Sequence, residues 1–331
     1  MTLTNIEYLV FAGGGGRGLA YQSAIKKAQK NFGLDLKKVK GYAGTSVGAI
    51  SALIIALEHD MDKLGDDITN CPGEAFKDYS LSSIWRFLTH FGFCKGKVLE
   101  DWLKDFIKQK TQLEDPTFAE LYAKTGVVIK CYATNLSTGN LQELSVEETP
   151  NAKVAKSIKT SCAIPVVFEP TVTTDGDYLV DGGLLKNYPI DAFDTPCDRF
   201  NKEHNKKTLG LFATGKFSLK AHVGELFTSH IEGIINFIFS LVDTIIHREA
   251  TQMTELDKSR TVFVNCPDSI NATTFSMNAD AQKETEGLVE NNIASFIAES
   301  RSKPPIITYS QSDSRLAKTP RSLGKSFQSF Q

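Results

Sequence analysis

The stretch Tyr8-Leu-Val-Phe-Ala-Gly-Gly-Gly-Gly-Arg-Gly18 decides how this chain folds. Residues 8–12 form a short apolar run that ends at glycine, which is typical of a buried strand. From Gly18 to Phe32, apolar residues recur at helical spacing. A strand, a glycine turn and a helix in succession predict the first unit of an α/β fold with a largely parallel sheet.

The same pattern repeats directly downstream. Residues 40–43 read as a brief strand, Gly44-Thr-Ser-Val-Gly48 as a tight turn, and residues 47–58 as an apolar helix. Residues 127–134 and 141–146 predict a hairpin, because the intervening residues 135–140 are turn formers. Further strands are predicted at 178–180, 209–213 and 261–265, and further helices at 98–110, 152–162, 219–254 and 278–299.

Ser46 is the candidate nucleophile. It lies between Gly44 and Gly48, after a predicted strand and before a predicted helix, which is the context that a G-x-S-x-G nucleophile elbow needs. The helix that follows would place partial positive charge near a developing oxyanion. The alternative is an ordinary strand-to-helix turn in which Ser46 or Thr45 caps the helix.

The glycine loop Gly13-Gly-Gly-Gly-Arg-Gly18 allows three interpretations. It contains G-x-G-x-x-G, a dinucleotide-binding pattern, and Asp35 lies near the distance expected for a ribose-binding acid. The loop could instead offer backbone N–H groups to a tetrahedral intermediate, or it could be a structural turn. We favour the intermediate-binding loop, because dinucleotide binding leaves Ser46 and Asp181 without a role.

Asp181 is the candidate general base. It directly follows the predicted strand 178–180, and α/β enzymes keep their chemistry at the carboxyl ends of strands. Asp-Gly is also a common turn signal, which is the alternative explanation. The histidines lie outside strand-end glycine motifs, so we expect none of them to be catalytic. They are His59, His90, His204, His222, His230 and His247.

With these motifs in this order, the chain resembles the patatin-like phospholipases from about residue 6 to about residue 297. The family's G-G-G-x-[KR]-G corresponds to residues 13–18, its G-x-S-x-G to residues 44–48, and its D-G-[AG] to residues 181–183. Residues 92–102 also resemble the family. Supporting matches are Ser161-Cys-Ala-Ile-Pro165, Phe168-Glu-Pro170 and Asn187-Tyr-Pro189.

The resemblance implies a three-layer α/β/α fold with a largely parallel central sheet, and a Ser–Asp dyad. Ser46 would attack an ester carbonyl, and Asp181 would accept its proton directly and then activate water. The oxyanion would be held by the amides of Gly14, Gly15 and Gly16. The supporting loop positions would be Gly13, Arg17, Gly18, Gly44, Gly48, Gly182 and Gly183.

Arg17 has two possible roles within this loop. It could anchor the loop, or it could place positive charge near a substrate phosphate, and we slightly favour the anchor. The resemblance implies phospholipid, lysophospholipid or neutral glycerolipid substrates at a membrane surface, and an active site with no metal and no other cofactor.

We therefore expect a lipid acyl hydrolase of the phospholipase A or lysophospholipase type. Acyl transfer on the same dyad is an open alternative, and so is a catalytically silent lipid- or protein-binding module. A nucleotide-binding oxidoreductase is the least favoured alternative. A protein activator is a further partner to be tested.

The bulk composition excludes other classes. A net charge of −2 over 331 residues argues against general nucleic-acid binding. The six cysteines form no C-x-x-C pair and suggest scattered reduced thiols rather than a metal site. Residues 1–8 lack the features of a secretory signal, and no apolar stretch is long enough to span a bilayer. We expect a cytoplasmic, peripherally membrane-associated protein, or one delivered to another cell without an N-terminal signal peptide.

The chain divides into two predicted regions. Residues 1–300 would form the patatin-like phospholipase domain. Residues 301–331 are rich in Ser, Pro, Lys and Arg without periodicity, and they hold six basic residues and one acidic residue. This composition predicts a basic, disordered tail.

Two apolar segments leave open whether they are buried or face lipid. The first could be core or an interfacial patch, because aromatic rings suit the lipid–water boundary; its members are Trp85, Phe87, Leu88, Phe91 and Phe93. The second is the predicted helix over residues 231–246, which is apolar around much of its circumference. For this helix we expect burial in the core.

Overall fold

A computed structural model describes residues 3–60, 63, 82–196, 202–215, 230–270 and 279–302. Its α-helices are α1 (Ala20–Phe32), α2 (Val47–Leu57), α4 (Ser82–His90), α5 (Lys97–Thr111), α6 (Phe118–Thr125), α7 (Val154–Ser161), α8 (His230–Gln252), α9 (Glu255–Lys258) and α10 (Ala279–Ser302). Short 3-10 helices are η1 (Leu3–Asn5), η2 (Gly15–Leu19), η3 (Leu36–Lys38) and η5 (Gly182–Leu184).

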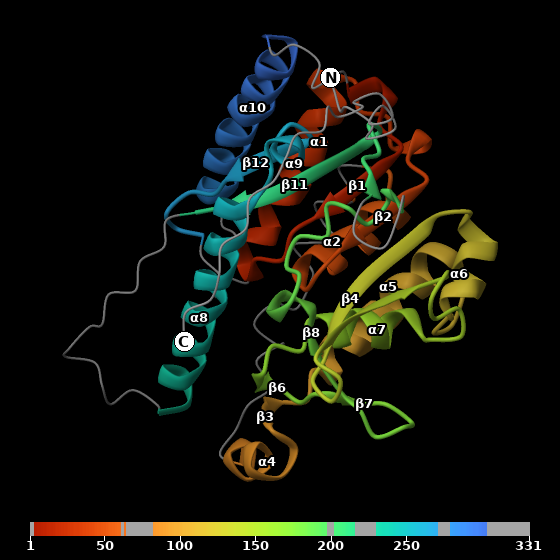
Figure 1. The fold of residues 1–331 in the computed structure, drawn as a ribbon, viewed down its shortest axis with the longest axis vertical. Coiled ribbons are helices and arrows are strands. Elements are labelled where there is room, and N and C mark those ends of the chain that lie inside the picture. The colour runs from red at the N-terminus through yellow and green to blue at the C-terminus, as the bar shows by residue number, and fades with distance from the viewer. Residues whose placement is uncertain are drawn as a thin grey trace, which may run out of the picture.

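The strands are β1 (Tyr8–Phe11), β2 (Gly41–Gly44), β3 (Gly92–Cys94), β4 (Val128–Asn135), β5 (Asn140–Ser145), β6 (Val166–Phe168), β7 (Thr171–Val172), β8 (Tyr178–Asp181), β9 (Thr195–Pro196), β10 (Lys202–Glu203), β11 (Thr208–Thr214) and β12 (Thr261–Asn265). The main sheet has eight strands in the order β12-β11-β1-β2-β4-β8-β7, with β5 paired to β4 (Figure 1). The five strands from β12 to β4 run parallel, which confirms the predicted α/β class with a largely parallel sheet.

The chain changes direction across the sheet at β1. From β1 it continues to β2 on one side and returns much later to β11 on the other side. Ligand sites of open α/β sheets lie outside the carboxyl ends of strands at such a switch point. The glycine loop directly follows β1 and therefore occupies this position.

Strands β2 and β8 meet end to end along one edge of β4. Strand β2 pairs with the first half of β4, where Gly44 lies level with Cys131. Strand β8 pairs antiparallel with the second half, where Asp181 lies level with Ala133. Because β5 pairs with residues 130–135 of β4, it must occupy the opposite edge. The ends of β2 and β8 therefore face each other, although only β2 ends at the carboxyl edge that we expected for both.

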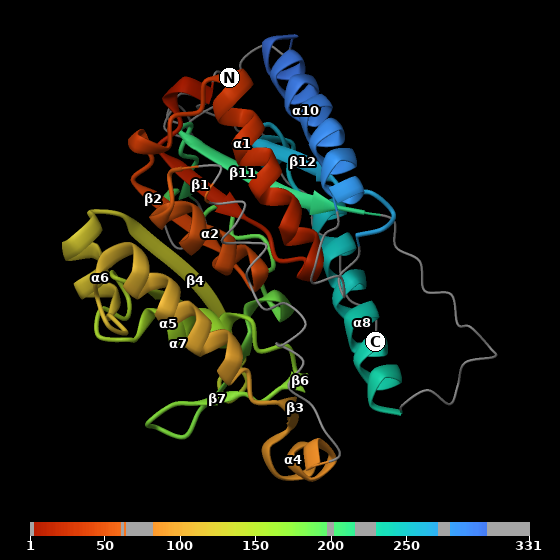
Figure 2. The same cartoon turned by 180° about the vertical axis from the view of Figure 1, so that it is seen from behind.

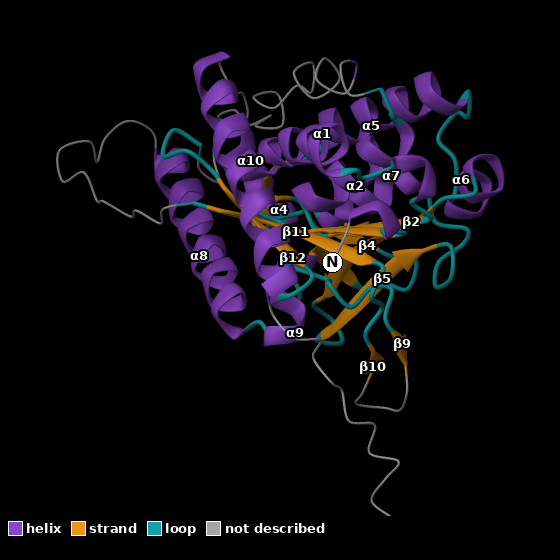
Figure 3. Cartoon of the chain, turned by 90° about the horizontal axis from the view of Figure 1, so that it is seen from above, coloured by secondary structure: helices purple, strands orange, loops and turns teal. Residues whose placement is uncertain are grey.

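The two faces of the sheet bury alternate residues of each strand, as strand geometry requires. On β1, Leu9 and Phe11 join the core formed with α1, α2, α5, α6, α7 and α10. Figure 2 views the molecule from the side of α1, α2, α5 and α7, and Figure 3 shows the helices and the sheet from above. Val10 faces the other way, into a smaller core that includes Tyr188 and, from α8, Ile246. Among the described helices, α8 alone contributes to this smaller core, so the second helical layer consists of one helix.

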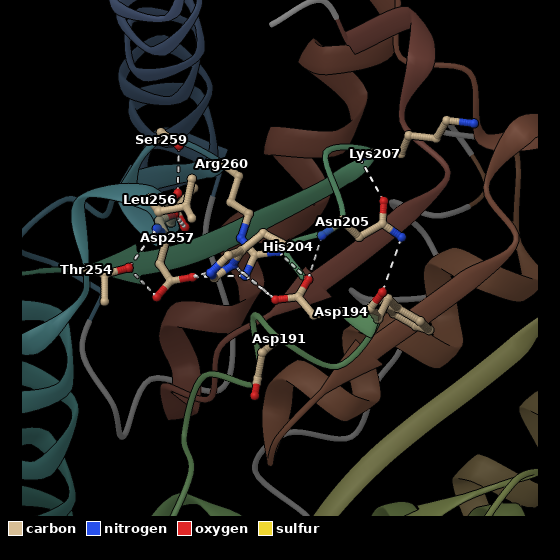
Figure 4. A network of polar contacts seen from close by, with 12 residues as sticks. Asp191, Asp194, His204, Asn205, Lys207, Thr254, Leu256, Asp257, Ser259 and Arg260 are labelled. Atoms are coloured by element: carbon tan, nitrogen blue, oxygen red, sulfur yellow. Dashed lines mark hydrogen bonds and ion pairs between the residues drawn. The ribbon is translucent and has the colours of Figure 1, made fainter. Parts of the chain in front are cut away.

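A buried polar network lies at the amino ends of β11 and β12 (Figure 4). The guanidinium group of Arg260 makes two hydrogen bonds to Asp194, of 2.6 and 2.7 Å. It also donates to Asp257 at 2.9 Å and contacts His204 Nδ1 at 3.0 Å. Both terminal nitrogens of this guanidinium are paired, and they tie the amino end of β12 to Asp194 and His204. It lies at the opposite end of these strands from the loop that follows β1.

The aromatic segment from Trp85 to Phe93 is partly core and partly exposed, so each of the two interpretations applies to some of its residues. Phe87 and Phe93 stack with ring centroids 4.9 Å apart and belong to a small core. In contrast, Trp85, Leu88 and Phe91 are exposed to 72%, 64% and 56%. The segment is therefore core on one side and solvent-facing on the other.

The expectation that the apolar helix over residues 231–246 is buried is only half right. Phe239 and Ile246 of α8 are buried, but Ile234, Phe237 and Leu241 are exposed to 43–57%. An amphipathic separation is absent because both sides are apolar. None of the helices that the structure describes is long and apolar enough to cross a membrane.

Two of the predictions fall partly outside the described residues. The helix predicted at 219–254 is seen from His230, and residues 216–229 lie outside the described residues. The predicted tail also lies outside them, except that α10 continues through Ser302. The division into residues 1–300 and 301–331 stays a prediction.

Candidate active site

Ser46 lies on a strained turn between β2 and α2. Its backbone angles are φ 56° and ψ −129°, an unusual conformation for a residue with a side chain. A Cβ atom on Gly44 would come within 2.2 Å of the Gly48 carbonyl oxygen, and one on Gly48 within 2.3 Å of the Phe11 oxygen. Both glycines are therefore required by close backbone contacts. Ser46 is the N-cap residue of α2, as the alternative explanation expected, but its side chain makes no capping hydrogen bond to the helix.

Ser161 fixes the elbow from behind. The Ser46 amide donates to the Ser161 hydroxyl at 3.1 Å, and that hydroxyl donates to the Tyr132 carbonyl at 2.6 Å. Ser161 is fully buried at the end of α7. The sequence showed Ser161 only as part of a motif, without a role. Its function as an acceptor for the Ser46 amide depends on α7 crossing β4, which the sequence does not reveal.

Asp181 is held at the end of β8 by its own backbone and by η5. Its amide donates to the Ala163 carbonyl at 2.9 Å, and its Oδ1 accepts from the Gly183 amide at 2.7 Å. A Cβ atom on Gly182 would lie 2.4 Å from the Tyr132 oxygen, so glycine is needed there too. The register of β2 and β8 on β4 then brings Asp181 beside Ser46.

The carboxyl group of Asp181 is difficult to ionise. Burial raises its pKa from the ordinary 3.8 to about 7, while the Gly183 amide and the nearby Ser46 hydroxyl act in the opposite direction. Oδ2 is buried and has no well-formed hydrogen bond among the described residues. The Ser46–Asp181 contact is thus present but loose, as is common for catalytic groups without substrate.

The glycine loop is held by Asn187. The Gly13 amide donates to the Asn187 carbonyl at 3.0 Å, and the Asn187 side chain donates to the Gly13 carbonyl at 3.1 Å. A Cβ atom on Gly13 would lie 2.2 Å from Asn187 Oδ1. The sequence showed Asn187 only as part of the Asn-Tyr-Pro motif. Its contact identifies it as a positioning residue for the loop.

The next three residues of the loop present their amides without internal partners. Gly15 has a φ of 55° and begins η2. Within the described part of the chain, the N–H groups of Gly14, Gly15 and Gly16 have no hydrogen-bond acceptor. The first amides of a helix are unpaired in this way and attract negative charge.

Arg17 is buried beneath the loop and paired with α8. Its two terminal nitrogens contact the two carboxylate oxygens of Asp243 at 2.7 and 2.9 Å. This bidentate pair agrees with the anchoring role rather than with a charge directed at substrate phosphate. The only sequence signal for Asp243 was its place as a charged residue inside an apolar helix. Gly18 packs on the elbow, because a Cβ atom there would lie 2.5 Å from a Val47 methyl group.

A pocket of about 410 Å3, including space open to solvent, joins these groups. Its polar side consists of Gly14, Gly15, Ser46, Asp181, Gly183 and Asn187. Its apolar side consists of Ile164, Pro165, Leu184, Phe239, Val242 and Ile245. Gly16 is not among the lining residues, and no described histidine is. Val166, next to Pro165, has a φ of 73°, which is a strained conformation for a β-branched residue.

The structure thus brings together the predicted Ser46, Asp181, Gly14 and Gly15. A hydroxyl group beside a buried carboxylate can lose a proton to it, and unpaired amides can hold a negative oxygen. The apolar side of the pocket suits a hydrocarbon chain. Asp35, the candidate ribose-binding acid, instead caps the short helix η3.

Comparisons with known proteins agree with this geometry. The chain is 29% identical over 196 residues to an uncharacterized protein, R571, of Acanthamoeba polyphaga mimivirus, covering 59% of this chain and 64% of the relative. It is 25% identical over 201 residues to a probable lipid hydrolase, 463L, of Invertebrate iridescent virus 6, covering 60% and 66%. The chain thus spans less than two thirds of the length of these relatives.

The fold is also similar to a solved structure. VipD from Legionella pneumophila matches with a TM-score of 0.52 at 16% identity, covering 89% of this chain and 67% of VipD. At this identity the likeness concerns the fold alone. The sequence model of the patatin-like phospholipases matches residues 9–194, more than half of the chain. The chain therefore belongs to the patatin-like phospholipase family.

Proposed function

We propose that this protein hydrolyses acyl esters of membrane lipids with Ser46 as nucleophile and Asp181 as its general base. The observation that supports this most is the pairing of a strained serine with a buried, incompletely hydrogen-bonded carboxylate at the end of an apolar pocket. A buried carboxylate with a raised pKa is a stronger base than an exposed one, and it needs no imidazole to accept the serine proton.

Acylation follows from this arrangement. Ser46 Oγ attacks the ester carbonyl carbon while its proton passes to Asp181 Oδ2. The carbonyl oxygen becomes negative and is held by the amides of Gly14 and Gly15, with that of Gly16 beside them. Each such amide contributes on the order of 3 kcal/mol to stabilising the transition state. Asp181 then gives the proton to the leaving alcohol.

Deacylation uses the same groups in the same roles. Asp181, ionised again, accepts a proton from a water molecule that attacks the acyl-Ser46 carbonyl. The second tetrahedral intermediate collapses, the acid leaves, and the proton returns to Ser46. Attack by another alcohol instead of water would give acyl transfer.

The apolar side of the pocket supports a long acyl chain as substrate. Ile164, Phe239 and Val242 offer only hydrocarbon to a ligand, so a chain of methylene groups would be removed from water there. The iridescent virus relative, a probable lipid hydrolase, supports the same class. A protein activator remains a prediction.

The test compares the wild-type protein with Ser46→Ala on mixed phospholipid, lysophospholipid and glyceride vesicles. Released acids and esters are identified by mass spectrometry, with EDTA in a parallel series. We expect fatty acid release by the wild type, with or without EDTA, and none by Ser46→Ala.

Ser51→Ala is the matched control. Ser51 is buried on α2 and donates to the Val47 carbonyl, one turn from the elbow, and lies outside the pocket. It should retain activity. Release by Ser46→Ala at the wild-type rate would refute the nucleophile, and ester products from an added alcohol in place of acid would show a transferase. No turnover of any lipid, with or without cell extract, would favour a binding module.

A further inference from the structure

Exposed apolar side chains gather at one end of the molecule. Among the described residues, most large hydrophobic side chains that are exposed belong to α4, the β7–β8 region, the segment after Asp181, or the outer side of α8. We call this set the apolar end. It consists of Trp85, Leu88, Phe91, Val172, Tyr178, Leu184, Leu185, Ile234, Phe237 and Leu241, with exposures of 38–72%.

The members of the apolar end belong to elements that touch one another. The rings of Phe91 and Tyr178 contact each other at 6.0 Å, which links α4 to β8. Phe87 of α4 and Phe239 of α8 share one small core with Phe93. Helix α8 also packs against η5, which carries Leu184. In Figures 1 and 2, α4, β7 and the amino-terminal end of α8 lie at the same end of the molecule.

The apolar end is continuous with the pocket. Leu184 lines the pocket and is 38% exposed, so it belongs to both. Helix α8 also connects them, because its inner side supplies Phe239 and Val242 to the pocket and its outer side carries Phe237 and Leu241 into solvent. A hydrocarbon chain could therefore pass from the surface into the pocket along apolar contacts.

Charge is sparse on the exposed sides of α8 and α4, whereas the turn between β7 and β8 carries the exposed Asp175. The exposed, described positions of α8 between residues 233 and 245 are Gly233, Ile234, Phe237, Leu241 and Thr244. On α4, the Arg86 side chain is paired with Glu169 at 3.2 Å and donates to the Phe93 carbonyl. A surface of tryptophan, phenylalanine and leucine with few charges suits the boundary between lipid headgroups and acyl chains.

Phe91 combines a strained backbone conformation with an exposed side chain. It ends α4 with a φ of 61°, a position that usually holds glycine. A left-handed conformation of a bulky residue is unfavourable unless the surroundings require it. Here it turns the chain into β3 and leaves the phenyl ring 56% exposed.

We propose that the apolar end docks on a lipid bilayer, with Trp85, Phe237 and Leu241 inserted at the level of the headgroups and the pocket opening toward the membrane. This proposal rests on the proposed function for the identity of the surface. The continuity of the exposed side chains with an acyl-binding pocket favours lipid over a protein partner, because substrate would then enter without leaving an apolar environment.

The chain supplies its own reporter for the test. It has two tryptophans, Trp85 and Trp102, and Trp102 is stacked on Phe106 within α5. In a Ser46→Ala, Trp102→Phe protein, fluorescence comes from Trp85 alone and the vesicles are not degraded. We expect phosphatidylcholine vesicles, with or without phosphatidylserine, to shift its emission to shorter wavelength, and brominated lipids to quench it.

Variants then locate the surface. Phe237→Gln with Leu241→Gln should weaken vesicle partitioning at least about tenfold, since two large apolar groups would no longer leave water. Tyr122→Gln is the matched control, because Tyr122 is 44% exposed on α6, away from the apolar end. In the background with Ser46 intact, all three changes should leave hydrolysis of a soluble short-chain ester unchanged, which shows that the fold is retained.

The binding assay is independent of turnover, so it can succeed even if hydrolysis fails. The absence of any Trp85 shift with both vesicle compositions would overturn the proposal. So would an equal loss of partitioning in Tyr122→Gln. Sedimentation without vesicles supplies a further check: a dimer that Phe237→Gln with Leu241→Gln dissociates would show that a second copy of the chain covers this surface instead.

Discussion

Asp181→Asn should make the protein more stable above neutral pH while removing its activity. Asparagine keeps a carbonyl oxygen that can accept from the Gly183 amide, as Oδ1 does at 2.7 Å. It cannot ionise, however, and Asp181 is almost completely buried, with 6% of its surface exposed. The substitution therefore removes a buried negative charge and leaves most of the local contacts in place.

The size and sign follow from the pKa of Asp181. This pKa is raised from 3.8 to about 7 by burial. Below pH 4 the group is protonated in the folded and the unfolded chain, so it does not affect their difference. Between pH 4 and 7 only the folded chain retains the proton, and stability falls as pH rises. Above pH 7 the loss of stability is complete. A pKa difference of about three units corresponds to about 4 kcal/mol in the free energy of unfolding.

The assay is urea unfolding of the wild type and Asp181→Asn between pH 4 and pH 8.5. We expect similar free energies of unfolding near pH 4 and a variant that is about 2–4 kcal/mol more stable at pH 8, since relaxation around the charge reduces the full value. Asp175→Asn is the control, because Asp175 is exposed in the turn before β8. A difference that is constant across pH, or a variant less stable at pH 8, would refute the raised pKa.

Three further predictions follow from the site. First, kcat/KM of the wild type on a soluble ester should rise with pH and level off above an apparent pKa near 7, because the proposed base must be ionised; a rate that falls through this range would count against Asp181 as base. Second, Ser161→Ala leaves the buried Ser46 amide without its acceptor and should lower the free energy of unfolding by about 1–3 kcal/mol together with kcat, whereas Ser157→Ala on the same helix should keep kcat. Third, Asp243→Ala leaves the buried Arg17 unpaired and should cost about 3–5 kcal/mol in urea unfolding, and Arg17→Met combined with Asp243→Leu should recover much of it. Equal losses in Asp243→Ala and in the double variant would show that an unpaired Arg17 charge is not the cause of the loss.

The sequence by itself determined the class of the fold and the residues that matter most. Short apolar runs that end in glycine motifs predict parallel strands followed by tight turns, because only glycine permits the close approaches that Gly44, Gly48 and Gly182 make. These are local constraints, so they are visible in the order of the residues. The assignment of Ser46 to a nucleophile elbow rests on such a constraint, and its backbone conformation agrees.

The residues that hold the site in place could be identified only from the tertiary structure. Ser161, Asn187 and Asp243 lie 115, 174 and 226 positions from the residues that they hold. Nothing in their local sequence identifies the partner, because a hydrogen bond of this kind is created only when distant elements pack together. The exposure of α8 on its outer side is another such case. An apolar helix surface can face a core or a solvent with the same sequence, and only the packing of α8 against β6 and η5 decides which residues are covered.

The meeting of Ser46 with Asp181 shows the difference most clearly. The sequence placed each residue after a strand, and both strands were expected to end at the same edge of a parallel sheet. In the structure β8 runs antiparallel and stops level with Ala133, two residues beyond the point where β2 stops level with Cys131. Strand register is set by side-chain packing over the whole sheet, so a change of one residue would have turned Asp181 to the other face. The sequence identified Ser46 and Asp181 as the candidate residues. Their contact was decided by the pairing of β2 and β8 along one edge of β4.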